Sequence, residues 1–157
     1  MVRTMQVEIR RAASSDAEEV SRVILRALRE TNARDYPPDV ITAVAVNFSP
    51  QRVAEKLATR RSCVAGLGGA VVGTASLDGR MIRSVYVDPA HQGKGIGARL
   101  MDVLEALARA EGATMLSVPS SVTAEGFYRK RGFVLVRDEF QGDERTIIMQ
   151  KHLGRAS

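Results

Sequence analysis

Hydrophobic positions recur along the chain at two spacings, one typical of strands and the other of helices. Alternating or continuous β-branched and apolar residues predict strands at residues 7–10, 62–66, 70–77, 81–87, 114–118, 133–138 and 146–152. Apolar residues three and four positions apart predict helices at residues 15–31, 39–47, 50–59, 96–111 and 123–131. Helices and strands therefore alternate irregularly, as expected for a mixed α+β protein.

The predicted helix ends carry their own signals. Ser15 and Glu18 form a capping box at the start of the first helix, and Ser49 followed by Pro50 predicts the start of the third. Pro37-Pro38 separates the first two helices, and Gly112 is the expected stop of the fourth.

Two glycine turns indicate how the strands pair. Leu67-Gly68-Gly69 and Asp78-Gly79 join strands 62–66, 70–77 and 81–87 as antiparallel neighbours. The next helix must carry the chain across the sheet, which makes strand 114–118 parallel to strand 81–87. We therefore expect a mostly antiparallel sheet with one parallel βαβ crossover, and a ligand crevice at that crossover.

The crossover begins with a glycine-rich stretch. Asp88-Pro89 ends strand 81–87, and Gly93, Gly95 and Gly97 lead into a helix beginning near Ile96. Glycine lets a ligand approach the backbone, and the first N–H groups of a helix have no partner within it. These free donors and the helix dipole predict an anion site that suits a phosphate or pyrophosphate, with Lys94 adding a charge.

Two common phosphate loops fit this stretch poorly. The P-loop pattern is absent, because no Ser or Thr follows Lys94 and the glycine spacing differs. Gly93, Gly95 and Ala98 do satisfy the dinucleotide fingerprint, which keeps an NAD(P)-binding oxidoreductase among the alternatives. That fold also needs an acidic residue after the next strand, where this chain has Pro119-Ser120-Ser121.

A third pattern accounts for more of the chain. Residues 92–97 read Q-G-K-G-I-G, which is an intact [QR]-x-x-G-x-[GA], and residues 85–89 read V-Y-V-D-P, close to V-x-V-x-P. With A-E-G-F-Y-R-K-R-G-F at residues 124–133, the chain resembles the GCN5-related N-acetyltransferases, the GNAT family, in order from Val7 to Leu153. The resemblance implies α/β/α layers around a central sheet of six to seven strands.

Composition sets the remaining bounds. The 157 residues are 45% hydrophobic and 26% charged, which predicts a single domain over residues 1–157. No apolar run reaches a membrane span and the start lacks a signal-peptide core, so we expect a cytoplasmic protein without membrane partners. Cys63 is the only cysteine and should be a buried, inert thiol. The net charge of +5 with only 4% aromatics suits an anionic cofactor better than nucleic acid.

The resemblance implies acetyl-CoA as the acetyl donor and no metal. Its pantetheine arm would lie along Val85 and Val87, and its pyrophosphate would bind backbone N–H groups of the glycine loop. Ser121 stands where the family often has Asn. The implied cofactor-binding residues are Val85, Tyr86, Val87, Gln92, Gly93, Lys94, Gly95, Ile96, Gly97, Ala98 and Ser121.

Tyr128 matches the family's general acid, which protonates the departing thiolate. A thiol titrates near ~8.5 and a phenol near ~10, so tyrosine is protonated when needed; alternatively Tyr128 packs with Phe127. A backbone N–H near Val87 could hold the oxyanion. Chemistry allows several general bases without selecting one, namely Glu30, Asp35, Tyr36 and His91, of which His91 is expected in an exposed loop.

We therefore predict an N-acetyltransferase that moves acetyl from acetyl-CoA to a primary amine by direct transfer in a ternary complex. A non-catalytic acyl-CoA sensor is the main alternative. We expect a monomer or homodimer, and we expect residues 29–60 to select the acceptor.

Overall fold

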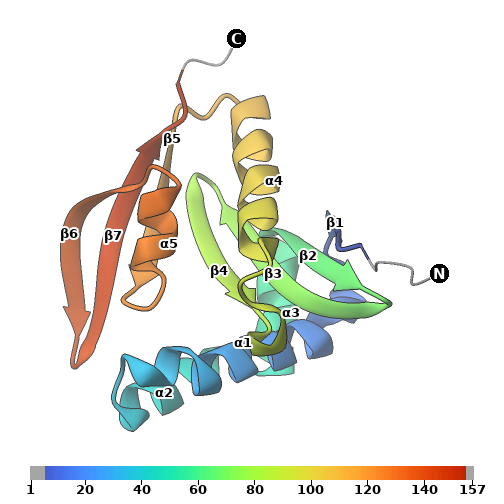
Figure 1. Cartoon of the computed structure of the whole chain (residues 1–157), viewed down its shortest axis with the longest axis vertical. Helices are drawn as coiled ribbons and strands as arrows, with labels where there is room; N and C mark the ends of the chain where they lie inside the picture. The colour runs from blue at the N-terminus through green and yellow to red at the C-terminus, as the bar shows by residue number, and fades with distance from the viewer. Residues whose placement is uncertain (1–5, 155–157) are drawn as a thin grey trace.

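A computed structural model describes residues 6–154 and contains one seven-stranded sheet in the order β1-β2-β3-β4-β5-β7-β6. The strands β1 through β4 form one wing and β5 to β7 the other (Figure 1). The strand bounds are β1 Glu8–Arg11, β2 Arg61–Leu67, β3 Ala70–Asp78, β4 Met81–Val87, β5 Met115–Ser121, β6 Val134–Gln141 and β7 Glu144–His152. Every neighbouring pair is antiparallel except β4 and β5, as the sequence predicted.

Helices cover both faces of the sheet. Their bounds are α1 Ala17–Glu30, α2 Pro38–Ala45, α3 Pro50–Thr59, α4 Ile96–Ala110 and α5 Glu125–Lys130. One apolar core joins α4 and α5 to one face, with Leu100, Leu116 and Phe133 at its centre. A second core, which includes Ile24 and Val64, packs helices α1, α2 and α3 against the other face. None of the helices within residues 6–154 is both long and apolar enough for a membrane span.

Strand β4 contains a bulge that the sequence did not predict. Tyr86 pairs with Thr74 but Arg83 pairs with Ser76, so β4 holds one extra residue between these pairs, at Ser84 with φ 53°. The bulge reverses the alternation of side chains. Consequently Val85 packs against the α4 core together with Ile82, although three positions separate them.

The parallel strands β4 and β5 share little pairing. Met81 is paired with Ser117, and the C-terminal ends of the two strands then belong to different wings of the sheet (Figure 1). On its other side β5 continues to pair with β7 as far as Ser121, opposite Thr146. The crevice expected at the parallel crossover is therefore open where both strands end.

Two local predictions are wrong. The predicted strand 114–118 extends to Ser121, because pairing with β7 continues through Pro119. The predicted capping box of Ser15 and Glu18 is replaced by Asp16, whose carboxylate accepts a hydrogen bond from Ala13 N at 2.7 Å. An ion pair with Arg10 at 2.8 Å holds that carboxylate in place and lowers its pKa.

Candidate active site

The glycine loop adopts the backbone geometry that an anion site requires. Gly93 and Gly95 have φ of 77° and 79°, the left-handed region that favours glycine. Nothing lies within 4 Å of a Cβ added at either position, so the space in front of the backbone is open. Gly95 is the N-cap of α4 and supplies no side-chain cap, so the first N–H groups of that helix stay free for a ligand.

Gly97 serves a different purpose from the other two glycines. A Cβ at Gly97 would lie 3.2 Å from Phe127 Cε1 and 3.3 Å from Cζ. A hydrogen at this position thus lets α5 approach the first turn of α4. The prediction that all three glycines are needed for their torsional freedom is therefore wrong for Gly97, whose lack of a side chain instead allows close packing.

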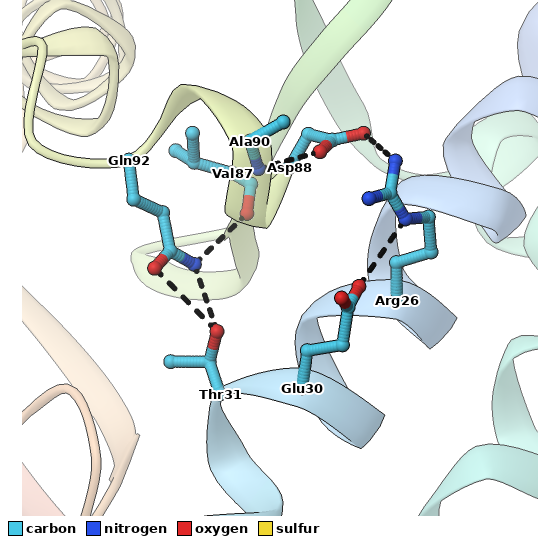
Figure 2. A network of polar contacts seen from close by, with 7 residues as sticks. All are labelled: Arg26, Glu30, Thr31, Val87, Asp88, Ala90 and Gln92. Atoms are coloured by element: carbon cyan, nitrogen blue, oxygen red, sulfur yellow. Dashed lines mark hydrogen bonds and ion pairs between the residues drawn. The ribbon is translucent and has the colours of Figure 1, made fainter.

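An ion pair ties the loop to α1. Asp88, buried at the end of β4, accepts a hydrogen bond from Ala90 N at 2.9 Å and pairs with Arg26 at 2.9 Å (Figure 2). Arg26 also contacts Glu30 at 3.3 Å. The turn that opens the loop is therefore anchored to a helix on the opposite side of the sheet from α4.

Gln92 adds a second tie between the same elements. Its side-chain nitrogen donates to Val87 O at 3.2 Å and contacts Thr31 Oγ1 at 3.1 Å (Figure 2). The amide thus helps to order the loop.

One cavity of 1170 Å³ runs along this region between the two wings of the sheet. It brings together the loop, the end of β4, the end of β5 and α5. The predicted residues that line it are Val85, Tyr86, Val87, Gln92, Gly93, Gly95, Ile96, Gly97, Ala98, Ser121 and Tyr128. Lys94 is exposed and does not line the cavity, so its charge acts on the site only through solvent.

Tyr128 combines both roles that the sequence left open. Its ring packs edge-on against Phe127 at 5.1 Å and Phe133 at 5.5 Å between centroids, and it also lines the cavity. The residue is only 4% exposed. Burial raises the pKa of its phenol above the ordinary value, and nearby Tyr86 raises it further, so Tyr128 stays protonated at neutral pH.

Two hydroxyls flank the end of β5. Ser121 Oγ accepts a hydrogen bond from Ala124 N at 3.1 Å, which leaves its own proton available to a ligand. Tyr36 Oη accepts from Val122 N at 2.7 Å and donates to Arg145 O at 2.9 Å. Tyr36 thus links the α1–α2 connection to the end of β5 and to β7. These bonds give a structural role to a residue that was also a candidate general base.

The other candidate bases differ in access to the cavity. Glu30 is paired with Arg26, and Asp35 accepts a hydrogen bond from Thr123 Oγ1 at 2.8 Å. His91 was expected in an exposed loop, which is wrong: it is partly buried and lines the cavity. Its Nδ1 is buried without a hydrogen-bond partner within residues 6–154.

Several charged residues of the cavity had no sequence signal. Lys56 comes from α3, Arg60 follows the last residue of α3, Arg83 comes from β4, and Glu144 begins β7. They belong to no motif and are distant in sequence, so only the fold brings them to one cavity. Periodicity in α3 could have shown that Lys56 and Arg60 share a face, four positions apart.

The family model of the GNAT acetyltransferase domain matches residues 32–153. The chain belongs to the GNAT acetyltransferase family. The uncharacterized N-acetyltransferase YafP of Escherichia coli is 29% identical over 133 residues, which cover 85% of both chains. The crystal structure of a GCN5-related N-acetyltransferase from Rhodopseudomonas palustris is 28% identical, with a TM-score of 0.89 over 97% of this chain and 99% of that one.

Two solved GNAT neighbours contain a coenzyme. YncA of Salmonella typhimurium, solved with acetyl-CoA, is 26% identical with a TM-score of 0.63, and the match covers 94% of each chain. PaiA of Thermoplasma acidophilum, solved with coenzyme A, shares the fold at 19% identity and a TM-score of 0.80, over 94% and 99% of the chains. Membership of this family, with a single parallel strand pair in the sheet, removes the dinucleotide-binding oxidoreductase from the alternatives.

Proposed function

We propose that this GNAT protein transfers acetyl from acetyl-CoA to a primary amine, directly and within a ternary complex. The observation that carries the proposal is the single cavity that joins the glycine loop, the open ends of β4 and β5, and Tyr128. A donor bound at the loop and an acceptor entering from the α2–α3 side would meet in that cavity. The acetyl-CoA complex of YncA supports the choice of donor.

The backbone supplies most of the donor site. The pyrophosphate binds at Gly93 and Gly95, whose geometry leaves the N–H groups open to it. The pantetheine arm extends β4 along Val85 and Val87, where β5 has diverged and left room for a strand-like ligand. Ser121, on the facing wall, offers its hydroxyl proton to the same arm.

Transfer then follows the chemistry of an acyl exchange. The amine nitrogen, once neutral, bonds to the thioester carbonyl carbon and then loses one proton to water, and a backbone N–H near Val87 stabilises the oxyanion. When the carbon–sulfur bond breaks, Tyr128 donates its phenolic proton to the sulfur and regains one from solvent. The raised pKa of Tyr128 keeps that proton in place until it is needed.

The substitution Tyr128→Phe tests this assignment because it removes one oxygen and keeps the ring that packs on Phe127 and Phe133. We expect kcat to fall by ~10²–10⁴ with KM for acetyl-CoA and the melting temperature nearly unchanged. The loss should shrink for an acyl donor with a more acidic thiol. A Phe variant with wild-type kcat would remove Tyr128 from the mechanism.

The same assays separate an enzyme from a sensor. A wild-type protein that binds acetyl-CoA but acetylates no amine in a broad screen would favour a non-catalytic acyl-CoA sensor.

A further inference from the structure

Three basic side chains, from α3, its C-cap and β4, line the same cavity. They are Lys56, Arg60 and Arg83. Arg83 Nε is buried and has no hydrogen-bond partner within the described part of the chain. Arg60 is 17% exposed in its side chain, and its one recorded ion pair is a 3.9 Å contact with Asp78, which is 51% exposed.

Burial and neighbouring positive charges both disfavour the charged forms of Arg60 and Lys56. Burial lowers the pKa of Arg60, and the charge of Arg83 lowers it further. Burial also lowers the pKa of Lys56, with the Arg60 charge as the second cause. Lys56 Nζ donates a hydrogen bond to the Asn47 carbonyl at 2.5 Å and lies 4.9 Å from the centroid of the Phe48 ring. Charges that are removed from water in this way normally have an anionic partner.

The regular alternation of β4 before its bulge brings Arg83 to this wall. Ile82 packs in the α4 core, and Tyr86 packs against the core of α1 to α3. Arg83 follows Ile82 in an extended strand, so it points to the opposite face, where the end of α3 carries Arg60. Arg60 Nη1 lies 3.5 Å from the Oγ of Ser84, the bulge residue, so the two arginines belong to neighbouring positions.

The cluster is too far along β4 to serve the donor's pyrophosphate. Arg83 lies four positions before Val87, which corresponds to about 13 Å in a regular extended strand, and the glycine loop begins beyond Val87. The cations therefore face the part of the cavity that lies past the reacting end of the donor.

We propose that the acceptor is a primary amine that also carries an anionic group, a carboxylate or a phosphoryl group, which binds between Arg60 and Arg83 with Lys56 nearby. This inference rests on the proposed acetyl transfer. Guanidinium groups suit both anions because their N–H groups match two oxygens at once. The acidic residues of the cavity come from other elements, namely Asp39 of α2, Asp143 of the β6–β7 turn and Glu144 at the start of β7, so the acceptor's amine can avoid the cationic wall.

A matched set of amines tests the proposal. The set pairs ω-amino acids, from glycine to 6-aminohexanoate, with their amides and with aminoalkylphosphonates of equal chain length. We expect at least one anionic member to exceed its amide in kcat/KM by about 10- to 100-fold, the effect of a charge-assisted hydrogen bond. The better of carboxylate and phosphonate identifies the anion. Amides that match both anions at every chain length would overturn the proposal.

Charge-removing substitutions test whether these residues cause the preference. In Arg83→Gln and Arg60→Gln, the kcat/KM for the anionic acceptor divided by that for its amide should fall toward one. The KM for acetyl-CoA should stay within about twofold of wild type. The matched control is Arg80→Gln, which removes an exposed charge just before β4 and should keep the wild-type ratio. Variants whose loss falls on acetyl-CoA instead would assign the cluster to the donor and refute the proposal.

A binding measurement keeps the two proposals distinguishable. If no amine is acetylated, the proposed function fails, and titration of the protein–coenzyme A complex with the same compounds still reports on the cluster. Tighter binding of an anionic amine than of its amide, lost in Arg83→Gln, supports the anion site. Equal binding of the pair across the whole set contradicts it.

Discussion

The geometry of Gly95 allows the effects of its substitution on stability and on coenzyme affinity to be worked out quantitatively. Its φ of 79° and ψ of 10° lie in the left-handed region, where a residue with a Cβ costs about 1–2 kcal/mol. Because nothing lies within 4 Å of an added Cβ, Gly95→Ala should lose only this torsional energy and no packing. Gly95→Val should lose more, since a β-branched side chain is poorly tolerated at positive φ.

Coenzyme binding should fall further than stability does. A side chain at Gly95 occupies the open space through which a phosphate reaches the backbone. Loss of one charge-assisted hydrogen bond, about 1.5–3 kcal/mol, weakens affinity by about 10- to 150-fold. Lys94 is exposed and outside the cavity wall, so Lys94→Ala should cost under ~1 kcal/mol, or less than about fivefold.

Titration calorimetry with acetyl-CoA and melting with and without the ligand measure these effects. Wild type at a hundred times Kd should gain about 2.7 kcal/mol of stability, and Gly95→Val should gain little. Gly126→Ala is the control, because Gly126 lies inside α5, has open space and has no positive φ. Equal losses of affinity in Gly95→Val and Lys94→Ala would show that side-chain charge, and not backbone geometry, holds the phosphates.

Two further predictions concern buried groups away from the cavity. The Glu105 side chain is 4% exposed and pairs with Arg131 at 2.8 Å and Lys151 at 2.6 Å, so Glu105→Ala should lower the free energy of unfolding by about 3 kcal/mol. The Asp102 side chain is 70% exposed, so Asp102→Asn should lower it by under ~1 kcal/mol. Equal losses of the two variants in denaturant titrations would refute this prediction. Burial raises the pKa of the Cys63 thiol to about 11, so at pH 8 the reactive thiolate is scarce; a thiol reagent should label native protein far more slowly than unfolded protein, and equal rates would contradict the burial.

Elements that begin and end at turn or capping residues were predicted closely. Strand β4 begins after the Asp78-Gly79 turn and ends at Asp88-Pro89, and its predicted bounds match the structure. Helix α3 is capped as expected, with Ser49 Oγ accepting from Arg52 N at 3.3 Å. Strand β5 was predicted too short because its end depends on a partner, β7, that lies about thirty positions later in the chain.

The candidate site also combines features that the sequence could predict with features that it could not. The backbone conformation of Gly93 and Gly95 was predictable because it depends on their own torsion angles. The packing of Gly97 on Phe127, the bulge at Ser84 and the buried Nδ1 of His91 could not, since each depends on atoms from another element.

By itself, the sequence determined the order of the elements, the antiparallel turns, the single parallel crossover and the glycine loop, because periodicity, glycine and proline act over a few residues. Tertiary structure alone decided which side chains meet in the cavity. It brought Tyr128 into the cavity with the end of β4, and it set Lys56, Arg60 and Arg83 in the same cavity. The physical reason is that burial and Coulomb interactions depend on distance in space, which the bulge and the divergence of β4 from β5 create.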